Sequence, residues 1–388
     1  MTRWLVANET ANNIVSNEYV YALFRCATFN WPQILVALLD RGVNVNSVVN
    51  SKDTVSPQMD VSPHNGKTAL HGALEQNNIE AINVLMERGA DVNIGYRRSQ
   101  PSLPLGVAVE AAAPLHVFDR PLVDGADFKL VGNRYAFFRI CASGRPDVLR
   151  RMLAHGALPD TDPAVDASGQ HSPLVEAVYS MSEAVLTQLH SRSVADGITK
   201  DAARLSIRCH VEARLETVRL LVEAGARIDD TRPPVEPIVA DILISAFSPL
   251  MGRHDAATYL MKAGAGPRTI SAVMDALRSS RPLASSDRLA RQLVRAGYVV
   301  GRSTIADLRQ RPAGGAAVDR YVAILADEAG KPPPLQRIVR TAIRNQLSTA
   351  TGGRSIFPVI DHLQLPVEIH RYLKLEGRFH DVETTRFN

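Results

Sequence analysis

The stretch GKTALHGALEQNNIEAINVLMERGADVN, residues Gly66 to Asn93, decides the fold of this chain. Thr68 stands just before an apolar run, where its side chain can cap a first helix. Gly72 and Ala73 are small enough to let neighbouring helices pack closely, and Gly89 is placed to end a second helix in the left-handed conformation. The stretch therefore predicts a pair of short helices.

The glycine that ends this pair recurs along the chain, in most cases with two apolar residues three and four positions before it. The recurring glycines are Gly42, Gly89, Gly125, Gly156, Gly225, Gly264 and Gly297. Their spacing fits a unit of about 33 residues, with one interval holding a degraded unit and another an insertion. On that period we expect about eight helix-pair units stacked into an all-α solenoid.

The unit from Gly66 to Asn93 resembles the ankyrin repeat, because it reads Thr-Ala-Leu-His at 68–71 and Arg-Gly-Ala-Asp-Val-Asn at 88–93. Ser172-Pro173-Leu174 is a partial second copy, and the register loosens after about residue 160. The resemblance implies an ankyrin-repeat solenoid over 19–330, divergent after about 160, with residues 1–18 as an N-terminal extension. It also implies protein binding through the concave face and the loop tips.

The substrate-binding residues of such an array are unknown from the sequence. Tyr96, Arg97 and Arg98 are candidate tip residues. The long polar insertion from Ser47 to Asn65 is interpreted as a disordered loop, with an ordered recognition element as the alternative. Cys26 and Cys209 stand at the same offset before their glycines as Ala73 does, so we expect both to be small buried core residues.

Residues 334–376 carry amphipathic helices that are too small to fold alone. The first helix begins after three prolines, which favour a helix start. Its apolar side chains recur at four-residue steps, at Leu335, Val339, Ile343 and Leu347. A later helix opens at Leu365-Pro366 and carries Ile369, Tyr372 and Leu373 at helical spacing. These faces must be covered by the neighbouring domain or by another protein.

The order and spacing of these C-terminal residues resemble a SOCS box, and their position after an ankyrin array is similar to the ankyrin-repeat and SOCS-box family. The resemblance implies a three-helix module over 334–376, followed by a tail of 377–388. It implies a substrate-recognition adaptor of an E3 ubiquitin ligase, with elongin B and C, a cullin (usually the fifth) and its RING protein as partners. Carried over by motif, the elongin-binding residues are Leu335, Val339 and Ile343, and the cullin-binding residues are Leu363, Leu365, Pro366, Ile369, Tyr372 and Leu373. Val339 departs from the pattern, since the family usually has cysteine there and a β-branched side chain enters a tight pocket differently.

Three alternatives stay open at this point. The C-terminal helices can simply cap the solenoid of a non-catalytic scaffold, because a terminal repeat must end on a polar outer face. The segment 365–369 also resembles the opening of an F-box, although only about fifteen residues follow Leu373. The arginines between Arg278 and Arg311 could bind nucleic acid, but a net charge of +4 and the lack of interleaved aromatic residues argue against it.

Composition and motifs argue against catalysis by this chain. The three cysteines are few and far apart, which disfavours disulfides and Cys-x-x-Cys metal sites. Gly66-Lys67-Thr68 lacks the preceding glycine of a phosphate-binding loop, because Val61 occupies that position. His71 is expected to hydrogen-bond the turn rather than to act as a base. We therefore expect no metal, no cofactor and no active site, and, with no signal peptide or membrane-spanning run, a cytoplasmic or nuclear location.

Overall fold

The structure, a computed structural model, describes residues 17–50, 64–97, 101–160, 172–180, 200–228, 253–265, 323–324, 326–327 and 335–376. Several sequence-based expectations lie outside these residues, namely the middle of the 47–65 insertion, Arg98, Gly297 and the arginines from Arg278 to Arg311. The chain divides into two compact units, Met1–Ile140 with Asp147–Leu158, and Cys141–Pro146 with Pro159–Asn388.

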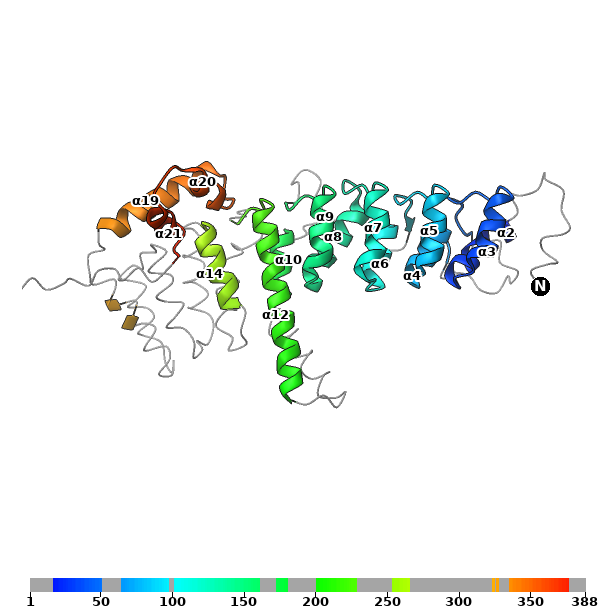
Figure 1. The fold of residues 1–388 in the computed structure, drawn as a ribbon, viewed down its shortest axis with the longest axis horizontal. Coiled ribbons are helices and arrows are strands. Elements are labelled where there is room, and N and C mark those ends of the chain that lie inside the picture. The colour runs from blue at the N-terminus through cyan, green and yellow to red at the C-terminus, as the bar shows by residue number, and fades with distance from the viewer. Residues whose placement is uncertain are drawn as a thin grey trace, which may run out of the picture. The chain divides into compact units, whose positions relative to one another are not determined.

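The first unit is built from pairs of short helices, and Figure 1 shows α2 to α7 following one another in chain order. The helices are α2 (Asn17–Thr28), α3 (Pro32–Asp40), α4 (Ala69–Glu75), α5 (Ile79–Glu87), α6 (Pro104–Glu110), α7 (Leu115–Val123), α8 (Val131–Ser143) and α9 (Pro146–Ala154). Helix α4 packs on α2, α5 and α6, so the pair α4–α5 contacts the pairs before and after it. Nearest-neighbour packing of this kind is the property expected of a repeat array.

Two-residue strands interrupt this helical pattern. Strand β1 (Tyr96–Arg97) pairs antiparallel with β2 (Pro101–Ser102), and an isolated bridge joins Val48 to Thr68. The prediction of an all-α fold holds for the described residues apart from these short pairings. The bridge is extended by Val49, whose backbone exchanges hydrogen bonds with Lys67 and Gly66. The described ends of the 47–65 insertion are therefore tied by hydrogen bonds to the residues just before α4, the first helix of the next helix pair.

The recurring glycines end helices as predicted. Gly42, Gly89, Gly125, Gly156, Gly225 and Gly264 all have φ between 80° and 113°, the left-handed region that other residues rarely adopt. An asparagine four residues beyond such a glycine, Asn46 after Gly42 and Asn93 after Gly89, links neighbouring helix pairs. The Asn46 side chain donates to the Gly89 carbonyl at 3.2 Å and accepts from the Asp91 amide at 2.8 Å. Asn93 makes the same two bonds with Gly125 and Asp127, at 3.0 and 2.9 Å.

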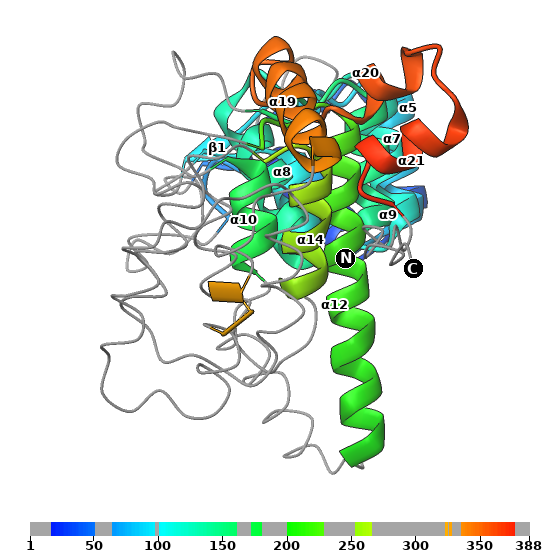
Figure 2. The same ribbon diagram turned by 90° about the vertical axis from the view of Figure 1, so that its left-hand side faces the viewer.

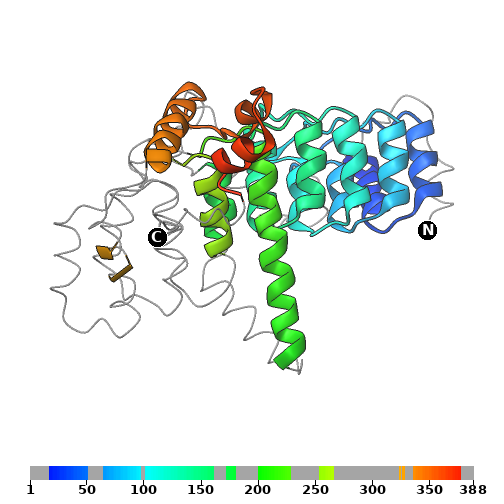
Figure 3. The same ribbon diagram turned by 60° about the vertical axis from the view of Figure 1, so that its left-hand side comes forward.

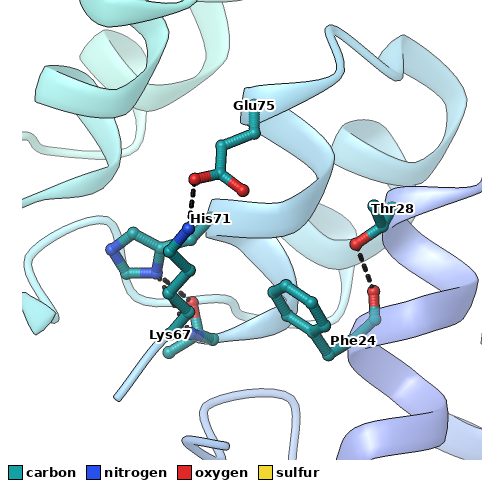
Figure 4. Close-up of polar contacts among 6 residues, drawn as sticks. Phe24, Thr28, Lys67, His71 and Glu75 are labelled. Atoms are coloured by element: carbon teal, nitrogen blue, oxygen red, sulfur yellow. Dashed lines mark hydrogen bonds and ion pairs between the residues drawn. The ribbon is translucent and has the colours of Figure 1, made fainter. Parts of the chain in front are cut away.

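The turn before α4 contains a buried polar cluster (Figure 4). The Thr68 amide donates to His71 Nδ1 at 3.1 Å, so the expectation that His71 hydrogen-bonds the turn is confirmed. Lys67 is 5% exposed, pairs with Glu75, and lies with its Nζ atom 5.1 Å from the centre of the Tyr96 ring. Tyr96 also meets the His71 ring edge-on at 5.0 Å and is 5% exposed. The expectation that Tyr96 is a binding residue at a loop tip is therefore wrong.

Close packing between α4 and α2 also explains why residue 72 is a glycine. A Cβ atom there would lie 2.5 Å from Thr28 Oγ1 and 2.9 Å from Phe24 Cε2. Both of these side chains belong to α2 and are labelled in Figure 4. Cys26 is buried on the same helix, as expected. Cys209 is exposed, so its assignment to the core is wrong. It lies on one continuous helix of 24 residues instead of on the inner helix of a short pair.

The second unit holds that long helix, α12 (Lys200–Glu223), between α10 (Pro173–Tyr179) and α14 (Arg253–Ala263). Three C-terminal helices follow, α19 (Leu335–Ala350), α20 (Phe357–His362) and α21 (Val367–Leu373). Figures 2 and 3 show these three helices near one end of α14. The number of repeat units, about eight from the glycine spacing, stays a prediction.

Candidate protein-docking surface at the C-terminal helices

The three C-terminal helices share a small apolar core. Ile356 and Ile360 are fully buried, Leu373 is 2% exposed, and Leu347 packs against them from α19. A core of this size is far too small to hold a domain by itself. The helices therefore depend on the rest of the second unit for their stability.

Backbone and side-chain hydrogen bonds provide that support. The Ile356 amide donates to the carbonyl of Ala263 at 2.9 Å, and Ser348 Oγ donates to the carbonyl of Gly264 at 3.1 Å. The Ile228 amide donates to the carbonyl of Gly353 at 2.8 Å. These bonds tie the C-terminal helices to the end of α14 and to the segments that follow α14 and α12.

Rings and cations add a second set of contacts between the same elements. The Tyr259 ring of α14 meets the Phe357 ring of α20 at 6.0 Å. Arg219 of α12 lies 5.9 Å from the centre of the Tyr259 ring, and Lys374 lies 5.7 Å from that of Phe357. Burial raises the pKa of the Tyr259 hydroxyl to about 12, so this ring stays neutral at physiological pH.

Helix α19 turns its charged side inward. Arg340 and Arg344 are each only 5% exposed, and Arg340 lies over the Tyr372 ring with Cζ 4.5 Å from the ring centre. Four of its apolar side chains point away from the unit, whereas Leu347 packs into the core: Leu335 is 74% exposed, Ile338 50%, Val339 47% and Ile343 38%. We call these four residues the outward face of α19. A surface helix of a folded domain ordinarily buries its apolar stripe, so this orientation is reversed.

A second group of exposed apolar residues lies in the loop after α20 and in the first turn of α21. Leu363, Leu365, Val367 and Ile369 are 36–59% exposed, and Pro366 at the start of α21 is exposed as well. The loop that carries them is held by an ion pair between Lys374 and Asp361 at 2.5 Å and by a contact of 2.7 Å between His370 Nε2 and the Leu363 carbonyl. Exposed apolar side chains that gather on one surface are typical of protein-interaction sites.

The structure therefore brings most of the residues predicted from the SOCS-box resemblance to the surface. Leu335, Val339 and Ile343 lie on the outward face of α19, and Leu363, Leu365, Pro366 and Ile369 lie around the start of α21. Tyr372 is half-buried against Arg340. Leu373 belongs to the internal core and has no exposed surface to offer, which removes it from the candidate docking residues. Sequence reasoning missed Ile338, which its spacing of three residues after Leu335 could have indicated.

The contact between Gly264 and Ile356 gives a test of how the C-terminal helices are seated. A Cβ atom at Gly264 would lie 2.8 Å from Ile356 Cγ2, and the residue has a φ of 113°. Gly225 is the matched control, because its φ is 95° and a Cβ atom there would meet nothing within 4 Å. Gly225→Ala carries backbone strain alone, roughly 1–2 kcal/mol.

We expect Gly264→Ala to cost at least about 1 kcal/mol more than Gly225→Ala, because the buried Ile356 must also move. Hydrogen exchange of the amides in residues 356–373 measures this difference as a loss of protection. Equal protection in the two variants would mean that Ile356 does not fix the seating of these helices.

Comparison with known families finds a match over the first 95 residues of the chain. The family described as ankyrin repeats (3 copies) matches residues 1–95, so this region carries ankyrin repeats. No curated protein matches the chain. Among solved structures, the ankyrin repeat domain of human ASB11 is similar at 16% identity, with a TM-score of 0.34, over 61% of this chain and 96% of that one. Within the described residues, no helix is long and apolar enough to span a membrane, and no three His, Cys, Asp or Glu side chains gather as metal ligands do.

Proposed function

We propose that this chain is a non-catalytic substrate-recognition adaptor of an elongin BC/cullin-RING E3 ubiquitin ligase. Its ankyrin repeats bind the target protein, and its C-terminal helices dock the ligase core. One observation carries the proposal: helix α19 presents Leu335, Val339 and Ile343 outward while it buries Arg340 and Arg344. An exposed apolar stripe on a helix that the rest of the unit holds in place is suited to insertion into a groove on another protein.

The elongin half of the proposal assigns the outward face of α19 to elongin C. Leu335 at the start of the helix is the first anchor, Ile343 is the later one, and Ile338 and Val339 lie between them. Val339 occupies the position where the resemblance expects cysteine, and a β-branched side chain of similar volume fills such a pocket with a different shape. Buried apolar anchors of this kind commonly supply most of the binding energy of an interface.

The cullin half assigns the exposed residues around the start of α21 to a cullin, the fifth by the resemblance, together with its RING protein. Leu363, Leu365, Pro366 and Ile369 form this site. Tyr372 supports it from behind by packing on Arg340. Leu373 is left out because it is buried in the core of the three helices.

The alternative function is a non-catalytic ankyrin scaffold whose C-terminal helices only cap the array. The hydrogen bonds from Ile356 to Ala263 at the end of α14 and from Ser348 to Gly264 just after it are compatible with a cap. A cap, however, has to present a polar surface to water. The outward face of α19 is apolar, which favours a docking role over a cap.

An adaptor of this kind needs no active site. Ubiquitin transfer is accelerated when the target lysine is held near the charged conjugating enzyme, since proximity lowers the entropic part of the barrier. The chain contributes the two binding surfaces.

The test is calorimetric titration of the purified elongin B–elongin C dimer into the full chain and into a chain that ends at Ala329. We expect saturable binding to the full chain and none to the truncated one, while the truncated chain keeps a cooperative unfolding transition. No binding to the full chain would refute the ligase proposal. Loss of the transition in the truncated chain would support the cap.

A further inference from the structure

Two helices of the second unit end at the same guanidinium group. Arg344 Nη2 donates to the carbonyl of Met261 at 2.6 Å and to that of Lys262 at 3.0 Å, both in the last turn of α14. Arg344 Nη1 donates to the carbonyl of Leu373, the last residue of α21. The side chain that makes these three bonds comes from the middle of a third helix, α19.

Carbonyl groups in the last turn of a helix have no partner within the helix, and they carry the negative end of its dipole. A buried cation is costly unless it is fully hydrogen-bonded. At Arg344 the two requirements satisfy each other, because the helix ends supply acceptors and the guanidinium supplies donors. With α19 in this place, the last-turn carbonyl groups of α14 and α21 gain hydrogen-bond donors, and the buried guanidinium of α19 gains acceptors.

We propose that Arg344 is a positioning residue that fixes the direction of α19 by capping α14 and α21 at once. The proposal deepens the proposed function, and its relevance to ligase assembly rests on that function. With Arg344 on the inner side of α19, residues 335, 339 and 343 are held on the opposite side, where a partner can reach them. The orientation of the ligase core relative to the second unit then depends on Arg344, together with the bonds from Ser348 and Ile356 to the end of α14.

The shape of the guanidinium is what this role requires. Its planar fork directs separate N–H groups in fixed directions, so one side chain bridges two helix ends that lie on different sides of it. Lysine carries the same charge on one nitrogen atom and can serve one helix end well. Ser348, one turn later on α19, adds its bond to the Gly264 carbonyl but carries no charge for the dipoles.

The experiment measures the distance between α12 and α19 by pulsed electron paramagnetic resonance on the full chain. One spin label is placed on Cys209, which is naturally exposed on α12, and the other on Gln346→Cys, an exposed position of α19. Cys26 and Cys141 are buried and are not expected to react. We expect one narrow distance distribution for the parent protein and a distribution at least twofold broader for Arg344→Met.

Two further variants separate positioning from simple loss of folding. Arg344→Lys keeps the charge, so we expect helicity by circular dichroism to be retained while the distribution still broadens. Arg371→Met removes an exposed arginine of α21 and is expected to leave the distribution narrow. A parent-like distribution in Arg344→Met, or in Arg344→Lys with retained helicity, overturns the proposal.

The outcome is independent of the ligase assignment, because no elongin is present in the distance measurement. A separate titration of elongin B–elongin C into the parent chain tests the proposed function. Narrow parent distances that broaden in the Arg344 variants, combined with no elongin binding, would uphold the positioning role and refute the ligase.

Discussion

Leu335→Ala is expected to weaken binding of the elongin B–elongin C dimer by about 2 kcal/mol or more, which corresponds to roughly a 30-fold rise in Kd. Leu335 is 74% exposed at the first position of α19, so in the free chain its side chain adds little to the core. In the proposed complex the same side chain fills a pocket on the partner. The large effect should therefore fall on binding and leave stability nearly unchanged.

A leucine with similar exposure elsewhere in the chain provides the control. Leu158 is 68% exposed and lies outside the C-terminal helices, so Leu158→Ala should bind elongin as the parent does. Calorimetric titration gives Kd for all three proteins, and thermal unfolding checks that Tm is the same. If Leu335→Ala binds as tightly as Leu158→Ala, the outward face of α19 is not the elongin site.

The repeat architecture could be predicted from the sequence because its signals are local. The left-handed glycine and the cap of α4 both lie within a few residues of the helix end that they determine. The same short pattern recurs along the chain, which multiplies a weak signal. The bonds from Asn46 and Asn93 to the next helix pair follow from that repetition, although the sequence of a single helix pair does not predict them.

The C-terminal surface could be predicted only in part. Four-residue spacing placed Leu335, Val339 and Ile343 on one side of a helix, but spacing does not say which side faces water. That is decided by Arg344, whose acceptor at Met261 lies 83 positions away in the sequence. No local pattern connects the two residues.

Two other residues also have a burial that local sequence patterns do not predict. Leu373 follows Ile369 at helical spacing, yet it is buried because the end of α21 packs on Ile356 and Ile360. Cys209 has the same offset from its glycine as Cys26, yet it is exposed because α12 continues as one helix. In each case the environment depends on packing between elements rather than on the residue's place in a repeat.

Acid is expected to destabilise the N-terminal repeats through His71. Burial lowers the pKa of His71 to about 4 from its ordinary value of 6.5, and the nearby Lys67 cation acts in the same direction. The unfolded chain binds a proton on this side chain near pH 6.5, whereas the folded chain resists it until about pH 4. Stability is therefore present above pH 6.5 and is lost as the pH falls toward 4, by about 3 kcal/mol in all.

His71→Asn provides the comparison, because the Asn Oδ1 atom can accept the Thr68 amide in place of Nδ1 and does not titrate. Urea unfolding is followed by the fluorescence of Trp31 in a Trp4→Phe background, which reports on the first unit. Between pH 7 and pH 4.5 the parent should lose about 2–3 kcal/mol more than the variant. Burial lowers the pKa of His64 too, but that group is present in both proteins and cancels in the difference. Equal losses in the two proteins would show that His71 accepts a proton in the folded state as readily as it does in the unfolded chain.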